Sequence, residues 1–218
     1  MTVFEDRREA GRQLAAALRE ADVVGDGDRV VVLAIPRGGL PVGAEVARAF
    51  DAAFDVVVVR KLRSPNNPEL GFGAVGADGH VEIDHALTQE LGLSEEQIRN
   101  EVEDRSRAVD RRLELYRAVA PAVDLEDATV IVVDDGIATG GSARQACLLA
   151  RRGAAARVVL AVPVAPVGVA QEMEAVADAV VVLSSPAEFL AVDQAYRDFA
   201  QLDDDAAVAA LSSAGSKT

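Results

Sequence analysis

Cysteine, lysine and aromatic residues are all scarce in this chain of 218 residues. Because Cys147 is the only cysteine, no disulfide can form within the chain, and its place in an apolar helical pattern indicates a buried packing residue. The only lysines are Lys61 and Lys217, so arginine supplies nearly all of the positive charge. No apolar run approaches the roughly 20 residues of a membrane-spanning helix, and the first residues lack the basic-then-apolar order of a signal peptide. We therefore expect a cytoplasmic protein that does not bind a membrane.

Acidic residues clearly outnumber basic ones. The 36 aspartates and glutamates exceed the 22 lysines and arginines, which gives a formal net charge of -14 and a pI near 4.5. Nucleic-acid binding needs a basic face that displaces counterions, so this balance argues against nucleic acid as a partner. The acidic, lysine-poor composition favours a halophilic source; an ordinary mesophilic protein with a solvated acidic surface is the alternative interpretation.

Apolar strand candidates alternate with helical patterns along most of the chain. The strand candidates are short and rich in β-branched residues, and they cover residues 29–35, 55–60, 129–133, 157–162 and 179–183. Helical patterns cover residues 5–21, 40–50, 141–152 and 167–177. Strands that are apolar throughout belong to a sheet covered on both faces, so the pattern predicts a doubly wound α/β fold with a mainly parallel sheet. Ligands of such folds bind at the carboxyl ends of the strands.

One segment interrupts this alternation. Residues 88–119 carry a long, highly charged helical pattern, which we interpret as a helical insertion, and residues 73–84 before it favour a short hairpin. We expect one domain over residues 1–211. The small and polar residues 212–218 are expected to form a disordered tail.

An acidic pair and a glycine-containing loop follow the strand candidate at 129–133. Asp134 and Asp135 end the strand, and a helix is expected to begin near Gly141 and Ser142. Unpaired N–H groups and the helix dipole make such a helix start a site for an anion, and glycines let the backbone approach it closely. Carboxylates at the strand end can accept hydrogen bonds from ribose hydroxyls. A strand-to-helix turn with incidental aspartates is the structural alternative.

This segment closely resembles the phosphoribosyl pyrophosphate (PRPP) signature of type I phosphoribosyltransferases. Weaker likenesses to stand-alone members of that family lie at residues 4–7, 36–39, 60–61 and 189–199. The resemblance implies that Asp134 and Asp135 bind the ribose 2′- and 3′-hydroxyls. It also implies that the loop and the helix start bind PRPP around its 5-phosphate. These residues are Gly136, Ile137, Ala138, Thr139, Gly140, Gly141 and Ser142.

The resemblance also implies a pyrophosphate site at the end of the first strand candidate. Arg37, Gly38 and Gly39 would bind the pyrophosphate there, through a loop that often contains a non-proline cis peptide, which we expect between Arg37 and Gly38. Lys61, the only lysine outside the tail, could neutralise the leaving group, although it could also be an ordinary surface lysine. Mg²⁺ would bridge oxygens of PRPP while keeping most of its water, so we expect no metal site made of protein ligands.

The acceptor is harder to place from the sequence. Ala138 stands where 6-oxopurine enzymes of the family carry an aspartate, which argues against hypoxanthine or guanine. Residues 184–200 should form the C-terminal hood segment, in which Phe189 and Leu190 are candidates for acceptor binding; Phe189 could equally anchor the segment to the core. Glu69 could assist proton transfer or be a solvated loop residue.

Together these features predict a Mg²⁺-dependent enzyme that transfers ribose 5-phosphate from PRPP to a nitrogen acceptor, with a nucleobase as the leading candidate. A non-catalytic PRPP- or nucleotide-binding regulator of the same fold is the alternative. A phosphatase that uses the acidic pair is a third hypothesis, but haloacid-dehalogenase phosphatases need acids two positions apart, and that spacing is absent at Asp134. By family analogy the protein could form a homodimer.

Overall fold

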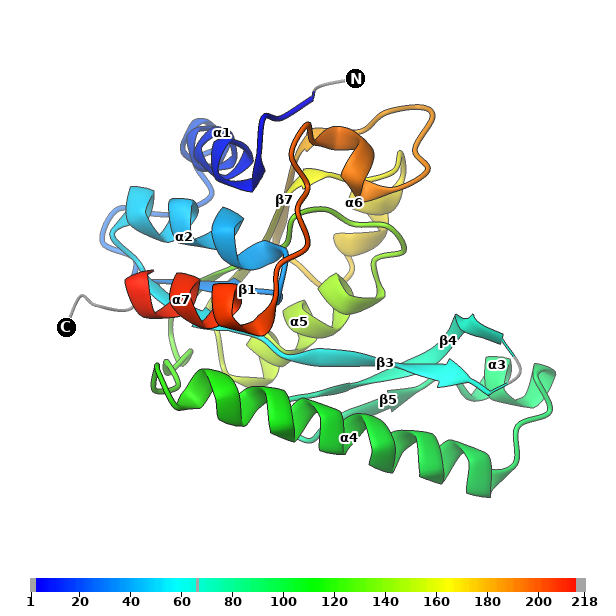
Figure 1. The fold of residues 1–218 in the computed structure, drawn as a ribbon. Helices are drawn as coiled ribbons and strands as arrows, with labels where there is room; N and C mark the ends of the chain where they lie inside the picture. The colour runs from blue at the N-terminus through cyan, green and yellow to red at the C-terminus, as the bar shows by residue number, and fades with distance from the viewer. Residues whose placement is uncertain (1–2, 66, 215–218) are drawn as a thin grey trace.

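A five-stranded parallel sheet forms the centre of the molecule (Figure 1). The structure, a computed structural model, describes residues 3–65 and 67–214. The strand order is β2-β1-β6-β7-β8, and every neighbouring pair is parallel. The strands are β1 (Val30–Ala34), β2 (Ala53–Val56), β6 (Thr129–Val133), β7 (Arg157–Val164) and β8 (Ala179–Ser184). This arrangement confirms the predicted doubly wound α/β class with a mainly parallel sheet.

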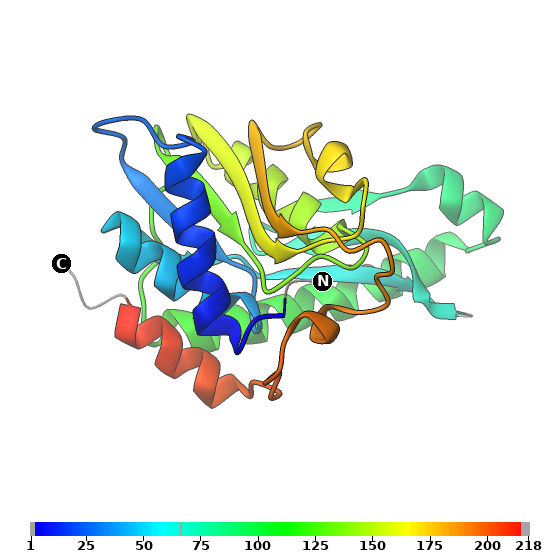
Figure 2. The same ribbon diagram turned by 90° about the horizontal axis from the view of Figure 1, so that it is seen from above.

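Helices cover both faces of this sheet, as Figure 2 shows. Alternate residues of each strand point to opposite faces, so the sheet contributes to two separate apolar clusters. One face packs against α1 (Arg7–Glu20), α2 (Gly39–Phe50) and α7 (Asp204–Ala214), and the other packs against α5 (Gly141–Arg152) and α6 (Val169–Met173). Cys147 of α5 lies in the second cluster, where burial raises the pKa of its thiol to about 12. This environment fits a packing residue rather than a nucleophile.

A second, antiparallel sheet projects from the body of the molecule. It contains β3 (Val59–Ser64), β4 (Asn67–Gly76) and β5 (Val81–Ile83). The short α3 (His85–Glu90) follows β5, and then α4 (Glu95–Arg117) covers one face of this sheet. The single strand expected at 55–60 was wrong, because this run is divided between β2 of the first sheet and β3 of the second. The run contains four consecutive valines and no glycine or proline that would mark the change of sheet.

The long insertion helix α4 is well defined at its N-terminus. Ser94 accepts a hydrogen bond from the backbone of Gln97, whose side chain accepts one from Ser94 N–H, and this reciprocal pair is a capping box. At the other end, Arg117 forms two hydrogen bonds with the buried carboxylate of Asp55 at 2.6 and 3.0 Å. The insertion is thereby tied to the central sheet, at the end of β2.

A segment near the N-terminus pairs with the segment that precedes α7. Phe4 N–H donates to Ala195 O at 2.8 Å, and Arg197 N–H donates to Phe4 O at 2.9 Å, which forms a short parallel bridge. The chain then continues into α7, which runs to Ala214. The tail expected to be disordered from Ser212 is therefore helical over 212–214, and residues 215–218 lie outside the described part. Among the described residues, no helix is both long and apolar enough to cross a membrane.

Candidate functional site

Two loops meet where β1 and β6 end. These strands are paired neighbours, with Ala34 opposite Val133, so their carboxyl ends deliver residues 36–39 and the acidic pair to the same place. A Cβ atom on Gly39 would lie 2.7 Å from Val133 O, and one on Gly38 would lie 1.9 Å from Asp135 Oδ2. Only glycine fits at either position without displacing its neighbour. The structure thus brings the predicted pyrophosphate loop into direct contact with the predicted ribose-binding acids.

The loop at the end of β1 contains one cis peptide bond. It joins Pro36 to Arg37, so the expected cis bond between Arg37 and Gly38 was misplaced by one position. The side chain of Arg37 extends to α7, where its Nη1 lies 3.5 Å from Asp204 Oδ1. The loop therefore has the expected kind of backbone, while its arginine is paired with a C-terminal residue that the sequence did not single out.

The carboxylates of the acidic pair are buried, and each accepts a hydrogen bond. Asp135 Oδ2 accepts a hydrogen bond from Arg7 Nε at 2.8 Å, and Asp135 N–H donates to Asp134 Oδ1 at 2.8 Å. Burial raises the pKa of Asp134 well above its ordinary value, and the neighbouring charge of Asp135 adds to that rise. Burial also raises the pKa of Asp135, but less, because the Arg7 guanidinium favours its ionised form. Buried carboxylates with raised pKa values occur often at ligand-binding sites.

Residues from both chain ends support Asp135, and sequence reasoning missed them. Arg7 also donates through Nη1 to Ala200 O at 2.9 Å, and its guanidinium carbon lies 3.7 Å from the centroid of the Phe199 ring. The hydroxyl of Tyr196 donates to Asp135 O at 2.6 Å. The only signal in the sequence was the family likeness at residues 4–7 and 189–199, which marks these segments without showing that they meet.

The loop after Asp134 encloses a cavity of about 190 Å³. Gly140 has a left-handed backbone, with φ of 76°, and immediately precedes the first turn of α5. Lys61 reaches this loop from β3, and its Nζ donates to Thr139 Oγ1 at 2.6 Å. The cavity is lined by Lys61, Asp134, Gly136, Ile137, Ala138, Thr139, Gly140, Gly141, Ser142, Ala143 and Val192. A helix N-terminus, a lysine and a carboxylate around one space suit a phosphorylated sugar.

Four predicted donor-binding residues do not line this cavity. The carboxylate of Asp135 is directed to Arg7, Arg37 is directed to Asp204, and the glycines of the same loop lie beside Asp135. Lys61 and the loop from Gly136 to Ser142 thus line one cavity, as expected, whereas Arg37 is paired with Asp204 outside it.

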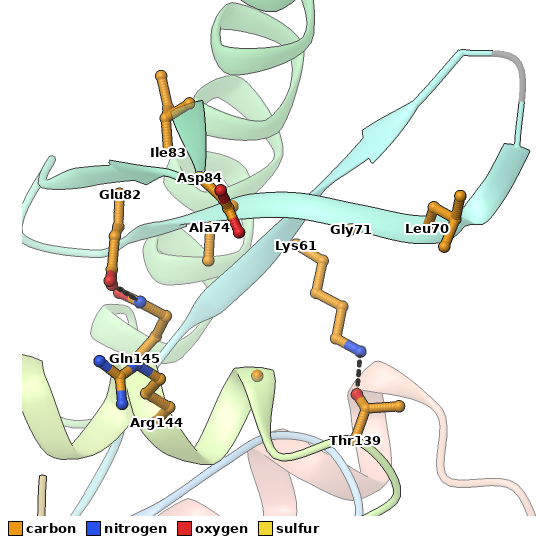
Figure 3. A pocket seen from close by; sticks show the side chains of 12 residues that line it. Lys61, Leu70, Gly71, Ala74, Glu82, Ile83, Asp84, Thr139, Arg144 and Gln145 are labelled. Atoms are coloured by element: carbon orange, nitrogen blue, oxygen red, sulfur yellow. Dashed lines mark hydrogen bonds between the residues drawn. The ribbon is translucent and has the colours of Figure 1, made fainter. Parts of the chain in front are cut away.

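A larger cavity of about 540 Å³ lies on the other side of Lys61 (Figure 3). It shares Lys61, Thr139 and Gly141 with the smaller one. Its far wall contains two carboxylates of the β4–β5 hairpin region, Glu82 and Asp84, together with Arg144 and Gln145 of α5; Gln145 donates to Glu82. Such a wall can bind both N–H donors and an anionic group.

The residues predicted to bind the acceptor occupy less defined positions. Phe189 is half-buried and packs against the cluster that contains Phe4 and Tyr196, while Leu190 is 83% exposed. Neither residue lines the two cavities described above. The side chain of Glu69 lies outside the described residues. Across residues 3–65 and 67–214, no group of three His, Cys, Asp or Glu side chains could hold a metal ion.

Comparison with known proteins identifies the family. A family model described as the phosphoribosyl transferase domain matches residues 4–193. The chain belongs to the phosphoribosyl transferase domain family. Two relatives from Mycobacterium tuberculosis strains, each named "Putative phosphoribosyl transferase", are 43% identical over 213 residues, which cover 97% of this chain and 47% of theirs. This phosphoribosyl transferase domain therefore spans about half the length of those curated relatives.

A solved structure extends the likeness to almost the whole chain. The crystal structure of TT1426 from Thermus thermophilus has a TM-score of 0.83 and 37% sequence identity, and the match covers 97% of this chain and 99% of that one. The family model ends at residue 193, so Tyr196 and the helix α7 lie beyond the matched phosphoribosyl transferase domain. The bond from Tyr196 to Asp135 nevertheless makes this C-terminal segment part of the site.

Proposed function

We propose that this protein is a Mg²⁺-dependent phosphoribosyltransferase that transfers the ribose 5-phosphate of PRPP to a nitrogen acceptor of the nucleobase class and releases pyrophosphate. The carrying observation is the single cavity that combines Asp134, the loop from Gly136 to Ser142 and Lys61. Membership of the phosphoribosyl transferase domain family supports the reaction class.

In the proposed reaction, the acceptor nitrogen forms a bond to C1 of the ribose while the bond from C1 to the pyrophosphate oxygen breaks. The electron pair of that bond leaves with pyrophosphate, and the acceptor gives up a proton. Asp134 and Asp135 accept hydrogen bonds from the ribose hydroxyls, which fixes C1 in position. The N-terminus of α5 holds the 5-phosphate, and Lys61 neutralises charge on the departing pyrophosphate. The protein thus acts by positioning and by charge neutralisation.

A magnesium ion fits this proposal only as part of the substrate complex. The acidic pair supplies two adjacent carboxylates, and no third ligand joins them among the described residues. Mg²⁺ keeps several water ligands and prefers phosphate oxygens, so PRPP itself would provide most of its coordination. When bound, the ion would neutralise charge on the departing pyrophosphate.

Two places have room or chemistry for the acceptor. The hood residues Phe189 and Leu190 remain our proposed acceptor-binding residues, and Glu69 remains the proposed proton-transfer residue. The larger cavity beside Lys61 is the competing place, because it adjoins the loop directly and carries Glu82 and Asp84. Phe189→Leu should raise the KM for the acceptor if the hood is correct. Glu82→Gln should raise it instead if the larger cavity is correct.

The test of the function is binding followed by turnover. Calorimetric titration with PRPP and Mg²⁺ should give saturable binding, and a panel of purine and pyrimidine bases should then release pyrophosphate. Asp134→Asn combined with Asp135→Asn should abolish PRPP binding while the circular dichroism spectrum of the fold is kept. Absence of PRPP binding at millimolar concentration would contradict the proposal. Binding without turnover of any base would favour the non-catalytic regulator.

A further inference from the structure

Three arginines from three different elements converge beside the loop at the end of β1. Arg112 of α4 places Nη2 at 3.0 Å from Asp204 Oδ1, and Arg37 approaches the same oxygen at 3.5 Å. Arg60 of β3 is the third; burial lowers the pKa of its guanidinium, and the charges of Arg112 and Arg37 lower it further. Figure 1 shows α7 and α4 on the same side of the molecule, where they pack against each other.

The charges in this cluster do not balance. Arg37 and Arg112 share the carboxylate of Asp204, and Arg60 forms no ion pair within residues 3–65 and 67–214. A local excess of positive charge is unexpected in a chain whose formal net charge is -14. Partly buried charges without partners are costly, so such an excess is best explained by an anion that binds there.

Tyr116 supplies a second, independent observation. Its side chain is fully buried, and its hydroxyl has no hydrogen-bond partner within residues 3–65 and 67–214. Burial raises the pKa of this hydroxyl, although the charge of Arg112 opposes the rise, so the group stays protonated and can donate. A buried donor without an acceptor costs free energy, and most native structures avoid it unless a ligand or water completes it.

We propose that Arg112 and Tyr116 of α4 join Arg37 and Arg60 to form a subsite for a diphosphate group, and that the carboxylate of Asp204 occupies this subsite until the ligand displaces it. Guanidinium groups bind phosphate oxygens in a bidentate manner, and a diphosphate offers more acceptor oxygens than the one carboxylate that Arg37 and Arg112 share. The inference rests on the proposed function, because it extends the pyrophosphate side of the PRPP site to α4 and α7. The half-exposed Arg37 and Asp204 leave a path for such exchange.

The competing explanation is that Asp204 only fastens α7 to α4. Titration with inorganic pyrophosphate, PRPP and ribose 5-phosphate separates the two, because ribose 5-phosphate lacks the diphosphate group. Arg112→Ala should weaken binding of pyrophosphate and PRPP about tenfold or more, and leave ribose 5-phosphate binding unchanged. Arg111→Ala, at the exposed neighbouring position on α4, is the matched control and should change neither. Unchanged pyrophosphate affinity in Arg112→Ala would overturn the subsite.

Substitutions of Asp204 and of Tyr116 should change the affinity for pyrophosphate in opposite directions. Asp204→Asn removes the competing charge, so pyrophosphate affinity should rise roughly threefold; a fastening role predicts no rise. Tyr116→Phe should keep the melting temperature, since it removes an unpaired buried hydroxyl, and should weaken pyrophosphate binding several-fold. Equal affinity of Tyr116→Phe and wild type would remove the tyrosine from the subsite.

The two proposals fail in different ways. Pyrophosphate that binds in an Arg112-dependent manner, together with a protein that does not bind PRPP, would refute the proposed function and leave the anion subsite standing. PRPP and ribose 5-phosphate that bind with equal affinity would refute the subsite and leave the donor-binding function standing. Each ligand is titrated into the protein of 218 residues with Mg²⁺ present.

Discussion

Arg7 Nε donates to Asp135 Oδ2 at 2.8 Å, although 128 positions separate the two residues in the chain. Arg7 lies in the first turn of α1, and Asp135 lies two residues after the end of β6. Because the same guanidinium packs on Phe199 and donates to Ala200 O, it connects three distant segments at one carboxylate. The carboxylate of Asp135, which we propose binds the ribose, is therefore positioned by residues that lie outside its own loop.

Arg7→Ala should destabilise the protein and weaken PRPP binding. The side chains of Arg7 and Asp135 are 10% and 14% exposed, and removal of one partner from a buried pair costs about 3 kcal/mol. Chemical denaturation and calorimetric titration with PRPP measure the two effects. Arg8→Ala is the control, because that side chain is 67% exposed and its change should stay within about 0.5 kcal/mol. Equal stability of the two variants would show that the pair does not hold the site.

Asp134→Asn should stabilise the protein near neutral pH while it abolishes donor binding. Burial and the charge of Asp135 raise the pKa of Asp134 above its ordinary 3.8, so the folded protein holds this proton more tightly than the unfolded chain does. The stability of the wild type must then fall as the pH rises from about 3.8 through the raised pKa. Asparagine removes this cost, and the advantage of the variant should shrink at acidic pH. Urea denaturation across that range tests it; a variant that is less stable at neutral pH would contradict the argument.

The pKa of Asp178 is lowered, so its effect on stability depends on pH in the opposite way to that of Asp134. Burial tends to raise its pKa, but hydrogen bonds from Arg151 and from Val158 N–H outweigh this and lower it below 3.8. The contribution of Asp178 to stability is therefore present above pH 3.8 and is lost as the pH falls through the lowered pKa. Asp178→Asn should be less stable than the wild type at neutral pH, with the difference decreasing in acid. The same denaturation series measures both variants.

Lys61→Met should reduce PRPP affinity with little effect on folding. The ammonium group donates to Thr139 Oγ1 in the donor loop, and the lysine lines both cavities. Loss of a charged donor to phosphate should weaken binding about tenfold, because such bonds contribute more than neutral ones. Arg63→Met serves as the control, since it removes an exposed cation two positions further along β3. Calorimetry that gives the same PRPP affinity for both variants would exclude Lys61 from the donor site.

Gly38→Ala should disrupt the acidic pair. The added Cβ would lie 1.9 Å from Asp135 Oδ2 and 2.3 Å from its Cγ, so the carboxylate must move away from Arg7. We expect a destabilisation of about 1–3 kcal/mol, typical of overpacking, together with loss of PRPP binding. Gly71→Ala should be tolerated, because its Cβ would meet nothing closer than 3.5 Å. Retained PRPP affinity in Gly38→Ala would show that the loop and the acid can separate freely.

The sequence was sufficient where the signal is local. The strand before Asp134, the glycine-containing loop and the start of α5 follow from residue types that lie next to one another, and the structure has them in that order. The central strands β1, β6, β7 and β8 were equally clear, since each is a short apolar run. The division of the run at 55–60 was not predictable, because only the distant partners of β2 and β3 reveal that they belong to different sheets.

The contacts between distant segments were not accessible from the sequence. Arg7, Tyr196 and Asp204 are ordinary residues in their local patterns, and their roles depend on partners that the fold supplies. The bridge between Phe4 and Tyr196 likewise joins two segments that lie far apart in the sequence. Tertiary contacts of this kind leave no periodicity, spacing or capping signal in either segment.

The bond from the Tyr196 hydroxyl to Asp135 O has a consequence for how the protein is made. Synthesis starts at the N-terminus, so α1 and the strands up to β8 can assemble while the segment from Tyr196 onward is still in the exit tunnel of the ribosome. Asp135 then has Arg7 beside it but lacks Tyr196, and the arginine lacks Phe199. The proposed donor site is therefore completed only after the segment through Phe199 has emerged from the ribosome, so a shorter nascent chain lacks part of the support of Asp135.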